Sequence, residues 1–162
     1  MADSIQIKEG KRAPDFVVTA SNGNEVSLSN FLDAPLALFF YPKNTAQECV
    51  KALCDFRDHF AEFKNLGVRL VGASVETLDS HNKFISKYNI PFLLLCDKDM
   101  KISKLYGVFQ PRKVAGSKVW AVVRTTFVID EKGVIVKIYD NVRNPDHVEE
   151  VLTFLRERYL PV

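Results

Sequence analysis

The sequence has few cysteines, no long apolar stretch and little net charge, and each shortage excludes a class of protein. Its three cysteines among 162 residues are too few for a disulfide-stabilised scaffold, and their odd number suits a reducing compartment. The longest apolar run, residues 36–41, is too short to span a bilayer, and the polar opening residues contain no signal-peptide core. We therefore expect a soluble, cytoplasmic protein that does not enter a membrane.

The charged residues are nearly balanced in number, with 22 basic against 20 acidic side chains and a net charge of +2. The basic residues cluster in nothing longer than pairs such as Lys11 and Arg12. Because phosphate binding needs a basic face, nucleic acid is not an expected partner. The length, and the absence of repeats or linkers, predict a single domain over residues 1–162.

Apolar patterns along the chain predict alternating strands and helices. The run at 36–41 is aromatic-rich and ends at Pro42, which is typical of a strand buried on both faces. Further strands are expected at 68–75, 91–96, 125–129 and 134–139, with hairpin turns at 22–24 and 130–133. Helical stripes cover 49–63, 78–88, 102–106 and 148–159. This order predicts an α/β, thioredoxin-like three-layer sandwich with a mixed central sheet flanked by helices.

One segment between these elements, residues 110–118, contains Pro111, Gly116 and several basic side chains. Proline and glycine are typical of connecting segments, and we expect a mobile surface loop here.

Cys49 lies where the turn after the strand at 36–41 becomes a helix. Ligands of open α/β sheets bind at this end of the strands. A thiol in a first helical turn faces unpaired N–H groups and the positive end of the helix dipole, and both favour the reactive thiolate. The alternative interpretation is a small, buried apolar residue of the helix stripe, because free cysteine is often buried.

Cys54 follows Cys49 by five residues, within the same predicted helix. At that spacing two helical Cα atoms lie roughly 8 to 9 Å apart and their side chains point about 140° from each other. This separation exceeds the reach of a disulfide. If the two cysteines act together, the first helical turn must unwind, between about residues 45 and 55. Zinc is not expected, because this spacing does not place both sulfurs on one helix face and the three histidines show no ligand spacing.

Short motifs occur in a fixed order over nearly the whole chain, from about residue 10 to 155. They are A-P-D-F at 13–16, S-L-S-N-F at 27–31, Y-P-K at 41–43, C-D-F-R-D at 54–58, S-H at 80–81, L-L-C-D at 94–97 and R-T-T-F at 124–127. In their order and spacing, the chain resembles the bacterioferritin-comigratory (PrxQ) branch of the peroxiredoxins.

The resemblance implies a thioredoxin-fold peroxidase that reduces hydrogen peroxide and organic hydroperoxides. It implies that Cys49 is the peroxidatic cysteine and that Cys54 is the resolving cysteine of an intramolecular disulfide. Arg124 matches the family's active-site arginine, whose guanidinium steadies the thiolate and the peroxide oxygens, and Pro42 matches the proline that shields the site from water. The resemblance further implies a monomer reduced by thioredoxin or glutaredoxin, with no bound cofactor and no metal.

The chain departs from the family pattern directly before the peroxidatic cysteine. Ala46 stands where the family has threonine, and Thr45 is one residue away from that position. The family threonine bonds to the thiolate, and losing one such bond costs about 1.5 to 3 kcal/mol, or roughly ten- to a hundredfold in rate. Gln47 and Glu48 replace a proline and a glycine, and the charge of Glu48 is expected to raise the pKa of Cys49. Peroxidase activity is therefore expected to be reduced or tuned to a different peroxide.

Two other functions are compatible with the fold. A thiol-disulfide oxidoreductase would carry Cys-x-x-Cys at the helix start and a proline ahead of the strand at 125, and both are absent. A binding or regulatory module that has lost catalysis is favoured only by Ala46. Cys96 follows a buried strand, and we interpret it as structural rather than redox-active.

Overall fold

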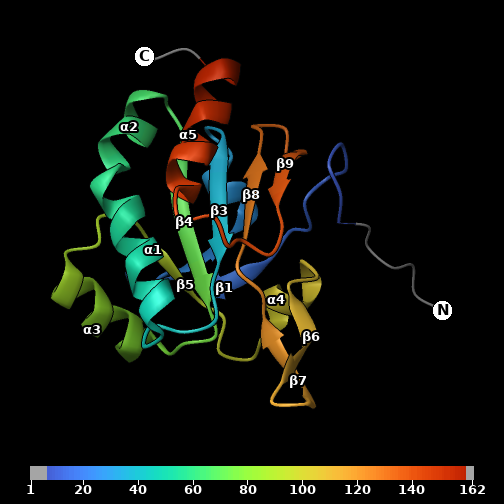
Figure 1. Cartoon of the computed structure of the whole chain (residues 1–162). Helices are drawn as coiled ribbons and strands as arrows, with labels where there is room; N and C mark the ends of the chain where they lie inside the picture. Colours follow the sequence, from blue (N-terminus) through green and yellow to red (C-terminus); the bar gives the residue numbers. More distant parts are fainter. Residues whose placement is uncertain (1–6, 160–162) are drawn as a thin grey trace.

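The computed structural model describes residues 7–159, in which strands and helices alternate along most of the chain (Figure 1). The strands are β1 Val17–Thr19, β2 Glu25–Ser27, β3 Leu36–Phe40, β4 Arg69–Ser74, β5 Leu94–Cys96, β6 Phe109–Val114, β7 Ser117–Val122, β8 Thr125–Ile129 and β9 Ile135–Tyr139. The helices are the 3-10 helix η1 Leu28–Phe31 and the α-helices α1 Gln47–Asp58, α2 Phe60–Asn65, α3 Leu78–Tyr88, α4 Lys101–Leu105 and α5 His147–Arg158. The ends of the expected domain, residues 1–6 and 160–162, lie outside the described residues. Within 7–159, no helix has the length and apolarity that crossing a membrane requires.

A five-stranded mixed sheet forms the middle layer, with the strand order β5-β4-β3-β8-β9. β3, β4 and β5 run parallel, because a helix crosses over between each strand and the next. β8 and β9 are antiparallel to their neighbours and are joined by a tight turn, in which the Gly133 N–H donates to the Asp130 carbonyl at 2.9 Å. The predicted mixed sheet and the hairpin at 130–133 are confirmed.

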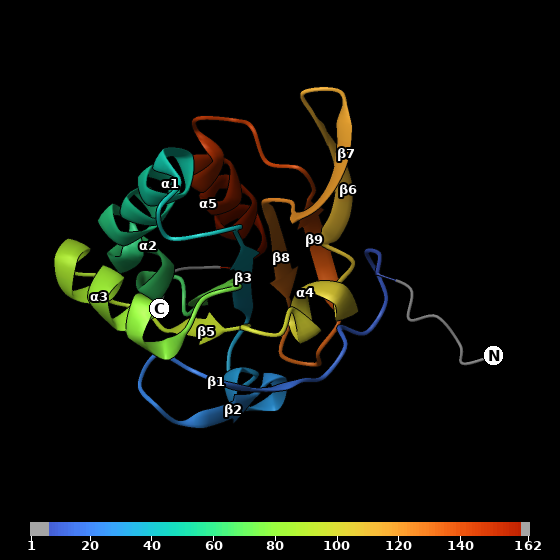
Figure 2. The same ribbon diagram turned by 90° about the horizontal axis from the view of Figure 1, so that it is seen from below.

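Strand β3 is buried on both faces, as its continuous apolar sequence predicts, and it divides the core into two halves. On one face, Phe39 stacks on Phe56 of α1 at a centroid distance of 4.3 Å, in a layer that also contains α2, α3 and α5. On the other face, Phe40 contacts Tyr106 at the end of α4, at 5.4 Å. Figure 2 shows the helices α1, α2, α3 and α5 on one side of the sheet and the β1–β2 hairpin on the other.

The hairpin expected around residues 22–24 is confirmed, and β5 is shorter than predicted. Strands β1 and β2 pair in antiparallel fashion, and Gly23 adopts a φ of 85° in the turn, a conformation that glycine permits. β5 begins at Leu94 rather than at Pro91, which has no N–H to donate to a neighbouring strand. The N–H of Leu94 instead bonds to the Ser21 hydroxyl at 3.0 Å, which ties this strand to the N-terminal hairpin.

The helix predicted over 49–63 begins two residues earlier, at Gln47, and is interrupted at His59. The His59 ring donates from Nδ1 to the Asp55 carbonyl at 2.8 Å, and the backbone of His59 has a φ of −107° and a ψ of 7° at the junction. A ring that bonds to a carbonyl four residues back disturbs the regular helix at this point, so α1 and α2 are separate helices.

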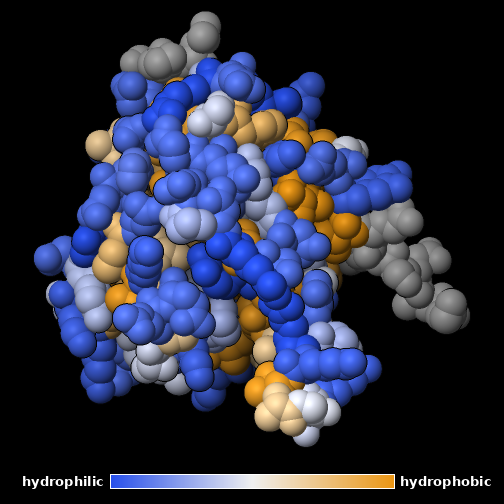
Figure 3. Space-filling model, in the orientation of Figure 1, coloured by the Kyte–Doolittle hydropathy of each residue, from blue (hydrophilic) through white to orange (hydrophobic). Residues whose placement is uncertain are grey.

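The segment at 110–118, expected to be a mobile loop, is instead part of the β6–β7 hairpin, and that prediction is wrong. Six residue pairs connect the two strands, from Phe109–Val122 to Val114–Ser117, and the turn contains Gly116 with a φ of 82°. The polar, proline-containing sequence does not predict strands, because the hairpin is buried only at its base, where Val122 joins the core and Phe109 packs against it. Val114, Val119 and Trp120 remain exposed, and Figure 3 shows apolar surface on the hairpin below the main body.

Candidate active site

Cys49 is the third residue of α1, the helix that follows the loop after β3. Its side chain is completely buried, with an exposure of 0%. The N–H groups of Cys49 and Val50 both bond to the Ala46 carbonyl, at 3.0 Å each, so the first turn is closed by backbone contacts. The structure therefore places the thiol in the first helical turn, as the sequence predicts, and also in the core.

The groups around the Cys49 sulfur have opposing effects on the pKa of its thiol. Burial raises the pKa of Cys49, and this is the largest effect. A hydrogen bond from the Lys43 N–H and the nearby guanidinium of Arg124 lower the same pKa, whereas the carboxylate of Glu48 raises it. The helix start alone predicts a pKa of Cys49 below the ordinary value, but the desolvation of the buried thiolate outweighs the effect of the helix start. The expected effects of Glu48 and Arg124 on the thiol have the predicted signs.

Arg124 reaches the site because of the register between two neighbouring strands. Phe40 pairs with Thr125, so the residue before β8 lies beside the residues that follow β3. The partly exposed Arg124 side chain lines a pocket of about 180 Å³ between α1 and the start of α5, together with Ala52, Phe56 and Arg143. Arg124 is far from Cys49 in the sequence, but its charge lowers the pKa of the Cys49 thiol.

Pro42 directly follows the sheet and opens the loop that carries the site. The last strand-like hydrogen bond before it runs from the Tyr41 N–H to the Ala73 carbonyl, at 3.1 Å. Pro42 itself is partly buried and has no N–H to extend the ladder. Its position is compatible with both termination of the strand and cover of the site.

Ala46 occupies the N-cap position of α1, and no side chain caps this helix end. Threonine at this position would supply a hydroxyl acceptor, which alanine lacks. Thr45 is exposed and lines a groove beside Ser80 and Phe84 of α3, and no hydrogen bond joins it to Cys49 within residues 7–159. The neighbouring threonine therefore does not replace the missing hydroxyl in this structure.

Cys54 is partly exposed and belongs to the same helix as Cys49, and both thiols are free. Because intact helical turns connect them, their geometry is the one that the spacing predicts, outside disulfide reach. A bond between them requires that the intervening turn open.

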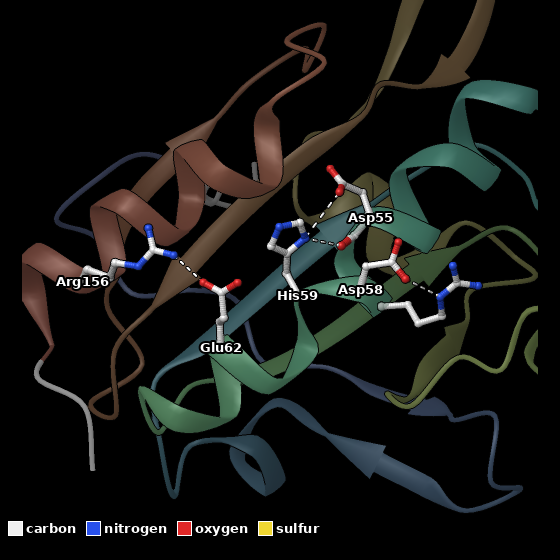
Figure 4. A network of polar contacts seen from close by, with 6 residues as sticks. Asp55, Asp58, His59, Glu62 and Arg156 are labelled. Atoms are coloured by element: carbon white, nitrogen blue, oxygen red, sulfur yellow. Dashed lines mark hydrogen bonds and ion pairs between the residues drawn. The ribbon is translucent and has the colours of Figure 1, made fainter.

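The chain after Cys54 is anchored by polar contacts, and Figure 4 shows those of His59 with Asp55 and of Glu62 with Arg156. The His59 ring contacts the Asp55 carbonyl at 2.8 Å and its carboxylate at 3.4 Å. Arg57 donates to the Tyr88 carbonyl of α3 at 2.8 Å, and Arg156 of α5 pairs with Glu62 of α2. These contacts attach the chain from Asp55 onward to α3 and α5.

Two buried polar groups beside the site escaped the sequence analysis. The imidazole of His81 and the amide of Asn44 lie 3.1 Å apart, although 37 positions separate them in the chain. Behind Arg124, the Thr126 hydroxyl lies 2.8 Å from Nε2 of His147, whose pKa is lowered by burial. Only the S-H pair within a family-like motif hinted at the first of these groups.

The remaining cysteine, Cys96, ends β5 and is partly exposed. Burial raises its pKa, and no charged group lowers it. Within residues 7–159, no three His, Cys, Asp or Glu side chains gather as a possible metal site.

A mixed sheet of this order, with a cysteine in the first turn after its central strand and an arginine beside it, defines a thioredoxin-like α/β protein with a thiol site. The AhpC/TSA family matches residues 10–138. The chain is 35% identical over 153 residues to "Peroxiredoxin Bcp" of Bacillus subtilis, which covers 94% of this chain and 98% of the relative. The chain belongs to the AhpC/TSA family, in the Bcp/PrxQ branch of the peroxiredoxins, and the resemblance seen in the sequence is confirmed.

Solved structures agree with this assignment. PrxQ of Xylella fastidiosa matches with a TM-score of 0.88 and 25% identity, over 95% of this chain and 98% of that one. The bacterioferritin comigratory protein of Xanthomonas campestris, studied for its reduction of alkyl peroxides, matches with a TM-score of 0.84 and 25% identity, over 88% and 91%. The chain thus has the fold and the family of thiol peroxidases, and the non-catalytic alternative is not favoured.

Proposed function

We propose that Cys49 is the residue that reduces the peroxide. Its thiolate attacks the terminal oxygen of a hydroperoxide, the O–O bond breaks, and water or an alcohol leaves after taking up a proton. The sulfur is oxidised to a sulfenic acid. The observation that carries this proposal is the thiol in the first turn of α1, between the Lys43 N–H and the Arg124 guanidinium.

Arg124 has two tasks in this step. Its fixed positive charge lowers the pKa of the Cys49 thiol, against the effect of burial. The same guanidinium donates toward the negative charge that develops on the leaving oxygen. Hydrogen peroxide and organic hydroperoxides are the proposed substrates, and the alkyl peroxide activity studied in the Xanthomonas relative supports the second class.

Cys54 completes the oxidation in the proposed cycle. Its thiol condenses with the Cys49 sulfenic acid, water leaves, and an intramolecular disulfide forms. The turn between the two sulfurs opens first, because the intact helix holds them apart. The polar contacts that anchor the chain from Asp55 onward limit this opening to the start of α1.

A dithiol reductant then returns both sulfurs to thiols by exchange, and thioredoxin or glutaredoxin is the proposed partner. An intramolecular disulfide needs no second subunit, so a monomer belongs to the same proposal. The cytoplasmic location expected from the sequence stays a prediction.

The roles of the cysteines are tested by thiol counts after one equivalent of hydrogen peroxide. The native protein is expected to lose two thiols, Cys49→Ser to lose none and Cys54→Ser to hold one trappable sulfenate per chain. Cys96→Ser is the matched control and should turn over like the native protein. Equal behaviour of Cys49→Ser and Cys54→Ser would contradict the assignment, and a large loss in Cys96→Ser would give that residue a redox role.

A further inference from the structure

The loop before α1 contains a buried amide whose side chain is held by three hydrogen bonds. Asn44 has an exposure of only 7%. Its Oδ1 accepts from the Tyr41 hydroxyl at 2.8 Å, and its Nδ2 donates to the Ser80 hydroxyl and to Nδ1 of His81, each at 3.1 Å. Since the amide uses both of its N–H donors and its oxygen, one orientation of the side chain is fixed.

The contact with His81 also fixes the state of the imidazole. Nε2 of this completely buried ring lies 3.0 Å from the Leu95 carbonyl, which can only accept. Nε2 therefore carries the proton, and Nδ1 of the neutral ring presents a lone pair to the Asn44 amide. Burial lowers the pKa of His81, in agreement with a neutral ring.

The backbone of the same residue is held as well. The Asn44 N–H donates to one carboxylate oxygen of Glu76 at 2.7 Å, and the Ser80 hydroxyl donates to the other at 3.0 Å. Side chain and backbone of Asn44 are thus attached to one group of residues, which comes from α3 and the segment before it.

Asn44 directly follows Lys43, whose backbone N–H lowers the pKa of the Cys49 thiol. Only the two backbone dihedrals of Lys43 separate this N–H from the Asn44 amide plane, because peptide units are rigid. Fixing the Asn44 unit therefore restricts the direction of the Lys43 N–H. We propose that Asn44, clamped by His81 and Glu76, is a positioning residue that aims the Lys43 N–H at the Cys49 sulfur. This inference rests on the proposed function of Cys49 but concerns residues that never touch the peroxide.

The test uses the full chain with Cys54→Ser and Cys96→Ser, so that Cys49 is the single thiol. Asn44→Ala and His81→Phe are each compared with Thr77→Ala, which removes the side-chain cap of α3 but leaves the Asn44 contacts in place. Two quantities are measured, namely the pH midpoint of Cys49 alkylation and the rate constant with hydrogen peroxide at pH 7.

Asn44→Ala and His81→Phe are each expected to raise the alkylation midpoint and to slow the peroxide reaction roughly tenfold, the effect of losing one hydrogen bond to a charged acceptor. Thr77→Ala should stay within about twofold of the parent in rate, with an unchanged midpoint. An unchanged midpoint in Asn44→Ala and His81→Phe, or an equal shift in Thr77→Ala, would overturn the inference.

If Asn44→Ala or His81→Phe fails to fold, Tyr41→Phe tests the positioning role instead, because it removes only the hydroxyl that donates to Oδ1 of Asn44. It should shift the midpoint in the same direction by a smaller amount, and no shift would count against the positioning role. Alkylation does not involve peroxide, so its result stands independently. A parent protein that ignores peroxide would refute the proposed function without deciding the role of Asn44.

Discussion

Replacing Ala46 by threonine supplies the side-chain cap that α1 lacks. The N-cap residue has an extended φ of −73° and ψ of 129°, the geometry from which a hydroxyl bonds to the N–H of the second or third helical residue. The third residue is Cys49 itself. Threonine in place of alanine at such a position stabilises a helix end by about 1 kcal/mol.

This stabilisation acts on the turn that must open before the two sulfurs meet. If opening precedes condensation, about 1 kcal/mol reduces the open population roughly fivefold, and disulfide formation slows by the same factor. The threonine hydroxyl beside Cys49 is expected to speed the first step of the cycle, the attack of the thiolate on peroxide. One added bond to the thiolate speeds the attack on peroxide by roughly ten- to a hundredfold.

Rapid mixing with one equivalent of hydrogen peroxide, acid quenching and mass spectrometry separate thiol, sulfenic acid and disulfide over time. Ala46→Val is the matched control, because valine has the shape of threonine without the hydroxyl. We expect Ala46→Thr alone to accumulate sulfenic acid. Disulfide formation at the same rate in Ala46→Thr and Ala46→Val would refute the reasoning that an uncapped helix end assists resolution.

Three further predictions concern charge, protonation and packing. Arg124→Met should slow the peroxide reaction by roughly 10²–10³, as for the loss of one group that stabilises developing charge, and an unchanged stopped-flow rate would remove Arg124 from the site. His81 and His147 both have pKa values lowered by burial. The unfolded chain therefore binds more protons below about pH 6.5, and urea unfolding should show stability falling as the pH drops through that value. His59 has a pKa that is raised, first by its bond to the Asp55 carbonyl, and its contribution to stability is lost as the pH rises above about 6.5. A urea midpoint that stays constant between pH 7 and 5 would contradict the roles of His81 and His147. Leu38→Ala, at a position with 0% exposure in the central strand, should cost about 2 to 5 kcal/mol of unfolding free energy, and a loss below 1 kcal/mol would argue against the packing described for β3.

Much of the fold was predictable because its central strands carry continuous apolar sequences. The run at 36–41 reads as a strand buried on both faces, and β3 is that strand. The β6–β7 hairpin was missed because Pro111 and Gly116 are typical of loops and its outward residues alternate without an apolar face. Two paired strands that bury neither face have no apolar alternation in their sequence, so a single sequence hardly predicts them.

Cys49 could be placed at the site in advance because it follows a predicted strand, whereas Arg124 was assigned only through the resemblance to the family. The sequence left open whether Cys49 is buried, because its exposure depends on how α1 packs on the sheet. The bond between Asn44 and His81 could not be predicted either, because it joins the loop after β3 to α3, 37 positions further along the chain. Sequence spacing predicts local geometry well and long-range polar contacts poorly.

Hydrogen exchange of the reduced and the disulfide forms tests most directly whether peroxide converts the start of α1 into an open, cross-linked segment. We predict that amides from about residue 47 to 54 lose protection on oxidation by one equivalent of peroxide, whereas α2, held by the Glu62–Arg156 pair, keeps its protection. Equal protection of residues 47–54 in both forms, in a sample whose Cys49–Cys54 disulfide is verified, would contradict the account.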